Sequence, residues 1–171
     1  MIDAGILTEN DQVELIFGEI VEKMSIGKRH GDCVDKLMVY FVLKYGLSHT
    51  CRSQNPLIVG DTSEPEPDFA ILDKASYEAR SGKPMAEDVH LILEVSDTTL
   101  EYDRSVKAKL YALGGIPEYW IINLQQDQVE VYLNPDKTTG EYNRLQRFAA
   151  DDTFESPFWG GVSVSDLLPS K

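Results

Sequence analysis

Hydrophobic positions change their spacing several times along the chain, and each change predicts a secondary-structure element. Val13–Phe17 and Glu19–Met24 are two short β-prone runs that meet at Gly18, which predicts an N-terminal β-hairpin. From Lys28 to Tyr45 the apolar residues recur at helical spacing, and Gly46 provides a stop signal. A hairpin and then one long helix are therefore expected at the start of the fold.

Short extended runs and polar loops are expected after this helix. Extended segments are predicted at Thr50–Gln54 and Leu57–Val59, followed by the loop GDTSEPEPD. Pro67 holds the end of that loop extended and places Asp68 at the start of a strand, DFAIL. The polar segment DKASYEARSGKPMAED then has room for one helical turn.

The run VHLILEV is the clearest strand in the sequence, and Glu94 is its one carboxylate. The segment that follows, SDTTLEYDRSVKAKLYALGG, predicts a single helix with an apolar stripe. Gly114–Gly115 end this helix, and its start can be capped by Ser96, Asp97 or Thr98. A strand that leads directly into a helix thus occupies the centre of the chain.

The last third of the chain predicts strands at IPEYWIINL, QVEVYL and EYNRLQRF and a short helix at VSVSDLLP. Glu118, in the first of these strands, is expected to be an exposed acid beside core residues. The whole pattern predicts an α/β (α+β) fold, in which helices flank a mixed β-sheet. A length of 171 residues suits a single domain, which we expect to span residues 1–171.

Composition favours an ordinary globular protein of the cytoplasm. Hydrophobic residues make up 42% of the chain and charged residues 26%. The N-terminus lacks the pattern of a secretory signal, and no apolar stretch reaches the roughly 20 residues that span a membrane. Cys33 and Cys51 lack metal-ligand spacing and are interpreted as free thiols, with a disulfide as the open alternative.

The net charge of −13 argues against a protein that coats nucleic acid without specificity, because phosphate neutralisation needs lysine and arginine. The charge balance is reversed from Gly27 to Arg52. This segment contains five basic and two acidic residues, which gives a local charge of +3. This segment is either a basic face on an acidic body or an ordinary solvated helix surface.

Asp68 and Glu94 are the first candidates for chemistry, since a carboxylate on a buried strand is costly unless it is paired or metal-bound. If their strands are neighbours, the two side chains converge on one cation, and oxygen ligands suit Mg²⁺ or Mn²⁺. The alternative is that Asp68 ends a proline-rich turn and Glu94 pairs with a basic side chain.

Asp103, Lys107 and Tyr111 follow at i, i+4 and i+8 and share one face of the predicted helix. Since this helix folds back over the sheet, Lys107 can reach the end of the Glu94 strand. The alternative is a solvated helix face with an Asp103–Lys107 ion pair.

His30, at the start of the first helix, could bind phosphate or carry a proton, or could simply be a polar surface residue. Glu19 and Glu22 face opposite sides of their strand, and Glu19 is the expected inward one. The sequence lacks a glycine-rich phosphate loop, G-x-S-x-G, H-E-x-x-H and C-x-x-C, which weakens NTPase, serine hydrolase, zinc protease and redox interpretations.

Several segments together resemble, in order and spacing, the Uma-two endonuclease family, formerly a domain of unknown function. They are ELIFGEIVEKMSIGKRH, SEPEPDFAIL, LILEVSDTTLEYDRSVKAKLYALGGIPEYWIINL and VEVYL. The block YDR…K…Y…GIPEYWI is the most specific part, and the resemblance covers nearly the whole chain. It implies a restriction-endonuclease-like core of the PD-(D/E)XK superfamily.

The resemblance also implies a set of site residues. Asp68 matches the motif aspartate and Glu94 the second acid, whereas Ser96 stands where a lysine is usual. Lys107 matches a lysine that has migrated to the following helix. Further positions of the family are matched by Glu19, His30 and Tyr111.

The leading interpretation is an endonuclease that depends on Mg²⁺ or Mn²⁺ and acts on nucleic acid, DNA in the first place. Asp68, Glu94 and the Val95 carbonyl would bind the metal, and Lys107 would stabilise the transition state. One alternative is a non-catalytic binding module of the same fold, and a second is a structural dimer unit without a ligand. The family resemblance also implies a homodimer, because a two-strand cut needs two sites.

Overall fold

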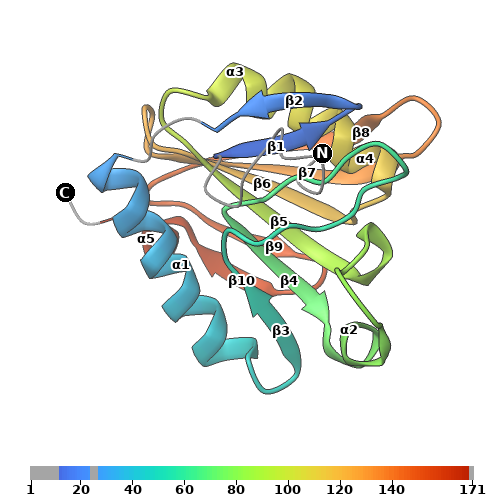
Figure 1. The fold of residues 1–171 in the computed structure, drawn as a ribbon. Coiled ribbons are helices and arrows are strands. Elements are labelled where there is room, and N and C mark those ends of the chain that lie inside the picture. Colours follow the sequence, from blue (N-terminus) through green and yellow to red (C-terminus); the bar gives the residue numbers. More distant parts are fainter. Residues whose placement is uncertain (1–11, 24–26, 170–171) are drawn as a thin grey trace.

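A six-stranded mixed β-sheet forms the centre of the computed structural model, which describes residues 12–23 and 27–169 (Figure 1). The strands run in chain order across the sheet; β5 and β6 are parallel, and the other neighbours are antiparallel. Their bounds are β3 His49–Arg52, β4 Phe69–Asp73, β5 Val89–Ser96, β6 Glu118–Asn123, β7 Gln128–Asp136 and β8 Glu141–Ala149. The predicted α/β architecture around a mixed sheet is confirmed.

Alternation along β5 decides which residues face which layer. Leu91, Leu93 and Val95 join the apolar cluster on one face of the sheet, and Ile92 joins the cluster on the other face. Glu94 and Ser96 share the face of Ile92, because successive strand residues point to opposite sides. The predicted strand is present and includes Ser96 as its last residue.

Helix α1, Lys28–Tyr45, covers the face of Leu91 and Leu93 with the bounds expected from its apolar spacing. Its buried residues are Cys33, Val34, Leu37 and Phe41. The same face also receives an unpredicted hairpin, β9 Thr153–Ser156 with β10 Gly160–Ser163, and the short C-terminal helix α5, Val164–Leu167.

The helix that crosses from β5 to β6 covers the opposite face. It consists of α3 (Leu100–Tyr102), the π-helical turn η2 (Asp103–Lys107) and α4 (Ala108–Gly114). The sequence predicted one uninterrupted helix, whereas Asp103 and Lys107 lie in a π turn. Such turns widen a helix locally and are common at functional sites.

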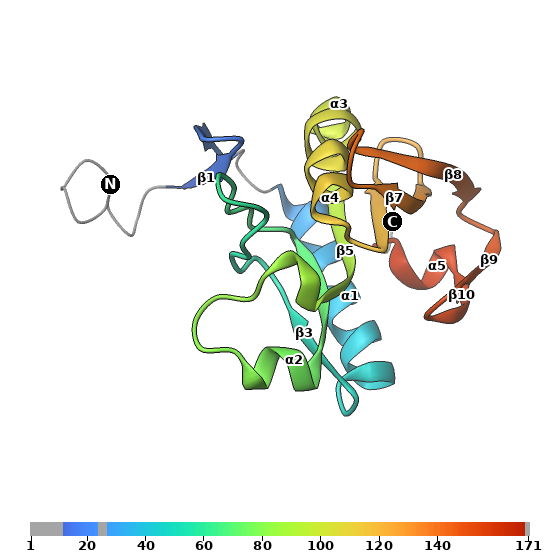
Figure 2. The same ribbon diagram turned by 90° about the vertical axis from the view of Figure 1, so that its right-hand side faces the viewer.

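The predicted N-terminal hairpin is confirmed and lies outside the large sheet, beside the loop that leads into β4 (Figure 2). Its strands are β1 Val13–Ile16 and β2 Glu19–Glu22, and the predicted end at Met24 lies outside the described residues. Gly18 N–H donates to the Thr62 carbonyl over 2.7 Å, and Phe17 N–H donates to Ser63 Oγ over 2.8 Å. These bonds fix the hairpin to the loop.

The segment between β3 and β5 contains less regular structure than strand propensity suggested. Within Leu57–Val59, only Ile58 makes a β-type pairing, an isolated bridge to Met85. The polar connection after β4 holds two short helices, α2 (Lys74–Ala79) and η1 (Ala86–Asp88). Among the described helices, none is both long and apolar enough to cross a membrane.

The expectation that Glu118 is an exposed acid is wrong. Its side chain is fully buried, and it accepts hydrogen bonds from Trp120 Nε1 at 2.8 Å and Ser156 Oγ at 2.7 Å. Burial raises the pKa of this carboxyl. Glu118 therefore links β6 to the β9–β10 hairpin, a role that requires donors which strand periodicity does not reveal.

Candidate active site

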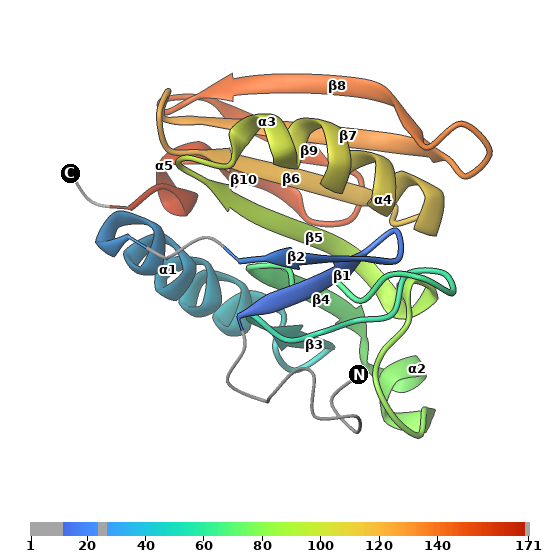
Figure 3. The same ribbon diagram turned by 45° about the horizontal axis from the view of Figure 1, so that its top comes forward.

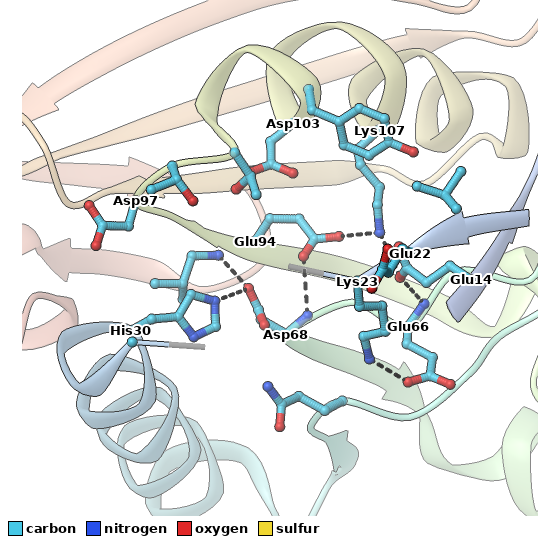
Figure 4. Close-up of a pocket in the computed structure, with 17 residues that line it drawn as sticks. Glu14, Glu22, Lys23, His30, Glu66, Asp68, Glu94, Asp97, Asp103 and Lys107 are labelled. Carbon is cyan, nitrogen blue, oxygen red and sulfur yellow. Dashed lines mark hydrogen bonds and ion pairs between the residues drawn. The ribbon is translucent and has the colours of Figure 1, made fainter. Parts of the chain in front are cut away.

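A cavity of about 550 Å³ lies between the N-terminal hairpin, the start of β4, the end of β5 and the helix that begins at α3 (Figure 4). Seven carboxylates line it, against two lysines, Lys23 and Lys107, and one histidine, His30. The lining thus carries a surplus of negative charge, which a cation could compensate.

The antiparallel pairing of β4 with β5 brings Asp68 and Glu94 together. Phe69 is opposite Leu93, so the residue before β4 lies beside the carboxylate of β5. Asp68 N–H donates to Glu94 Oε2 over 3.2 Å, and Val95 N–H donates to Asp68 Oδ2 over 2.8 Å. The convergence expected of neighbouring strands is therefore present. Val95 contributes its backbone N–H to the site, as a donor to Asp68.

Lys107 reaches the same place from the π turn. Its Nζ lies 3.3 Å from Glu94 Oε1 and 2.8 Å from Glu14 Oε1, and its side chain is only 5% exposed. Burial opposes its positive charge, but the two carboxylates outweigh burial and raise the pKa of Lys107. The amine therefore stays protonated between two acids.

Tyr111, one turn further along the helix, donates its hydroxyl to Glu94 Oε1 over 2.6 Å. Burial is the main reason why the pKa of Glu94 is raised far above its usual range, and the charges of Asp68 and Asp103 add to it. Lys107 acts in the opposite direction but is shared with Glu14. The positive charge near Glu94 is thus too small to offset the effect of burial on this carboxyl.

Asp103 turns toward the end of β5 rather than toward solvent. Ser96 Oγ and Thr99 Oγ1 each donate to Asp103 Oδ2 over 2.6 Å. The expected helix cap at Ser96 or its two neighbours is wrong, since Thr99 is the N-cap residue and makes no side-chain cap bond. Ser96 instead ties the strand to the π turn that carries Lys107.

His30, in the first turn of α1, contacts the other side of Asp68. Its Nε2 lies 3.0 Å from Asp68 Oδ2, and its Nδ1 is buried with no hydrogen-bond partner among the described residues. Burial opposes protonation of the ring, but the hydrogen bond and charge of Asp68 outweigh it and raise the pKa of His30. The structure thus brings His30, Asp68 and Glu94 into one chain of contacts.

Glu19 does not reach the cavity: it is exposed at the start of β2. Glu14 and Glu22 are the hairpin acids that line the cavity, so the expected choice of Glu19 over Glu22 is wrong. The buried one is Glu14, which accepts from Lys107 Nζ and from Glu66 N–H at 2.6 Å. Alternation in the sequence does not reveal this, because Val13 and Leu15 make the opposite face of β1 fully apolar. In the structure the buried face is nevertheless the one that carries Glu14 and Ile16.

The chemistry of these side chains fits a hard divalent cation. Asp68 and Glu94 offer carboxylate oxygens in a cavity whose lining is rich in negative charge. The described residues contain no group of three or more histidine, cysteine or acidic side chains arranged around a single point. That is compatible with Mg²⁺, which usually keeps several waters and takes one or two carboxylates from the protein.

Comparison with known proteins places this chain in a family. A family model described as Uma2, "Putative restriction endonuclease", matches residues 5–166. A crystal structure described as "a putative nuclease belonging to DUF820 from Anabaena variabilis ATCC 29413" is similar, with a TM-score of 0.72 and 15% sequence identity. The similarity covers 96% of this chain and 94% of that chain and shows a shared fold.

No curated protein matches the chain significantly. The family match, in contrast, covers nearly the whole sequence, and the expected resemblance is confirmed. The chain therefore belongs to the Uma2 family, whose members are described as "Putative restriction endonuclease".

Proposed function

We propose that this protein is a metal-dependent endonuclease that hydrolyses phosphodiester bonds in DNA. The observation that carries the proposal is the meeting of Asp68, Glu94 and Lys107 at one cavity, from three separate segments of the chain. Family membership adds independent support for nuclease chemistry.

Asp68 and Glu94 would hold Mg²⁺ or Mn²⁺, and the Val95 carbonyl is the proposed third protein ligand. When bound, such a cation polarises a phosphoryl oxygen and makes water a stronger nucleophile at neutral pH. His30 would support the site from outside, since its contact with Asp68 Oδ2 leaves Asp68 Oδ1 available for a ligand.

In a PD-(D/E)XK-type site, a lysine at the position that Ser96 occupies here supplies positive charge. In this protein Lys107 would supply that charge. Its ammonium would orient the attacking water and stabilise the negative charge that develops on the phosphoryl group. Glu14 positions this ammonium from the hairpin side, and Tyr111 fixes the orientation of Glu94 through its hydroxyl. In this proposal the lysine has migrated to the helix after the strand.

A non-catalytic binding module of the same fold is the second candidate. The net charge of −13 favours it, and so does the pairing of Lys107 with two carboxylates, because ion pairing is also a purely structural role. A homodimer, which would provide two sites for cutting two strands, stays a prediction.

Nicking of supercoiled plasmid with Mg²⁺ or Mn²⁺ tests the proposal. Wild-type protein should cleave, whereas Asp68→Asn and Lys107→Ala should each lose at least about 100-fold in rate. Lys109→Ala is the matched control, since Lys109 is exposed on the same helix. Equal residual cleavage by wild type and both site variants would leave the binding module as the better explanation.

A further inference from the structure

The proposed metal site lies deep beneath the N-terminal hairpin, and this depth bears on the substrate. The side chains of Glu14, Glu94 and Lys107 are 5–8% exposed. Figure 3 shows β1 and β2 passing in front of β4 and β5. The Lys23–Glu66 ion pair, 2.6 Å long, connects the end of the hairpin to the loop before β4. The hairpin is therefore bonded to the walls of the cavity.

The size of this cavity suits a small ligand better than a double helix. The cavity of about 550 Å³ is in the range of small-molecule sites, about 300–1,000 Å³, and cannot contain a base-paired segment. Its lining contains two lysines, Lys23 and Lys107, and seven carboxylates. It therefore lacks the row of basic side chains that would bind successive phosphates of a duplex. A single nucleotide accompanied by a divalent cation meets both constraints.

Tyr102 supplies a second, independent observation. It lines the cavity, yet its ring belongs to neither apolar cluster and pairs with no other aromatic ring among the described residues. Its hydroxyl is buried without a hydrogen-bond partner in the described part of the chain. An aromatic ring without an aromatic partner on the wall of a nuclease-like cavity is suited to contact an unpaired base, because every base has a face that can stack.

We infer that the cavity receives an unpaired nucleotide of single-stranded DNA, with its base against Tyr102 and its phosphate toward Lys107. The inference rests on the proposed endonuclease function and narrows its substrate. A perfect duplex cannot deliver a nucleotide into this cavity without unpairing it, and unpairing costs a few kcal/mol. Single strands and bulged duplexes avoid that cost.

Cleavage of three end-labelled DNA substrates with Mg²⁺ or Mn²⁺ tests this inference. The substrates are a single strand, a perfect duplex of the same sequence, and that duplex with a few unpaired nucleotides at its centre. We expect the single strand and the bulged duplex to be cut at least tenfold faster than the perfect duplex. Equal rates on all three would overturn the inference while leaving the endonuclease proposal intact.

Binding separates this inference from the proposed activity. Fluorescence anisotropy with Ca²⁺ in place of Mg²⁺ should give at least tenfold tighter binding of the single strand than of the duplex. If no substrate is cut, the endonuclease proposal fails; a retained single-strand preference in binding still supports the cavity assignment, and equal or absent binding overturns it. Tyr102→Leu should reduce the preference, and Tyr102→Phe, which keeps the ring, should retain it.

Discussion

Lys107 Nζ lies 3.3 Å from Glu94 Oε1, although the two residues are thirteen positions apart and belong to different elements. The contact that Ser96 makes at the end of β5 explains how this happens. Ser96 is fully buried and holds Asp103, so it anchors the first residue of the π turn to the end of β5. The last residue of that turn is Lys107, which the anchored turn directs at Glu94. Ser96 thus helps to place Lys107 beside Glu94.

Removing the Lys107 charge should affect both stability and activity. Lys107→Met leaves Glu14 and Glu94 buried without their shared cation, and breaking a buried ion pair in this way costs about 3–5 kcal/mol. Chemical denaturation should show this loss in the free energy of unfolding. Lys109→Met, on the exposed side of the same helix, should stay within about 0.5 kcal/mol of wild type. A Lys107 variant as stable as the control would contradict the buried ion pairs.

Glu14 and Glu19 form a matched pair for testing the hairpin. Glu14→Gln removes the charge that holds Lys107 at 2.8 Å, so we expect at least about a tenfold loss in cleavage rate, equivalent to about 1.4 kcal/mol. Glu19→Gln changes an exposed residue of the same hairpin and should leave the rate unchanged. Plasmid nicking compares the two, and a larger loss at Glu19 would favour the residue that sequence reasoning selected.

The fold was largely predictable because its signals are local. Helix α1 has an apolar stripe that spans its whole length, and β5 is a continuous apolar run whose one acid stands out. The meeting of Asp68 and Glu94 was expected on the condition that their strands are neighbours, and the pairing of β4 with β5 meets that condition. Their contact needs only strand pairing, which is among the simplest long-range relations in a sheet.

The remaining features depend on contacts that no spacing encodes. The π turn is a departure from regular helix geometry, and Glu14 reaches the site only because the hairpin packs against the loop before β4. Glu118 is buried because Ser156, from a hairpin late in the chain, supplies a donor. Each of these depends on where distant segments dock, and a pattern within one segment carries no information about that.

His30 provides a pH-dependent test of its contact with Asp68. Because Asp68 raises the pKa of His30, Asp68→Asn should lower it, and NMR titration of the imidazole without divalent cations measures the change. A raised histidine pKa contributes stability below the ordinary value of 6.5, and this is lost as pH rises through the folded-state value. The stability difference between wild type and Asp68→Asn should therefore shrink as pH rises. An unchanged His30 pKa in the variant would show that the contact is absent in solution.

A divalent cation should stabilise the protein, and more so at higher pH. Burial raises the pKa of Glu94 above its ordinary value of 4.5, so without a cation the folded state becomes less stable as pH rises and this carboxyl must ionise. A bound cation favours the ionised form and adds stability by mass action, about 2.7 kcal/mol at 100 times its dissociation constant. At low pH the cation must displace the proton of the Glu94 carboxyl, whereas at high pH that proton is already lost.

Thermal melts from about pH 5.5 to 8.5, with and without Mg²⁺ or Mn²⁺, measure this effect. The rise in Tm on adding the cation should grow with pH in the wild type and should be nearly absent in Glu94→Gln, which cannot ionise. Glu118→Gln is a matched control, because Glu118 is also buried with a raised pKa but lies outside the cavity, so its variant should keep the effect of the cation. A cation effect that persists in Glu94→Gln and is lost in Glu118→Gln would place the metal elsewhere in the molecule.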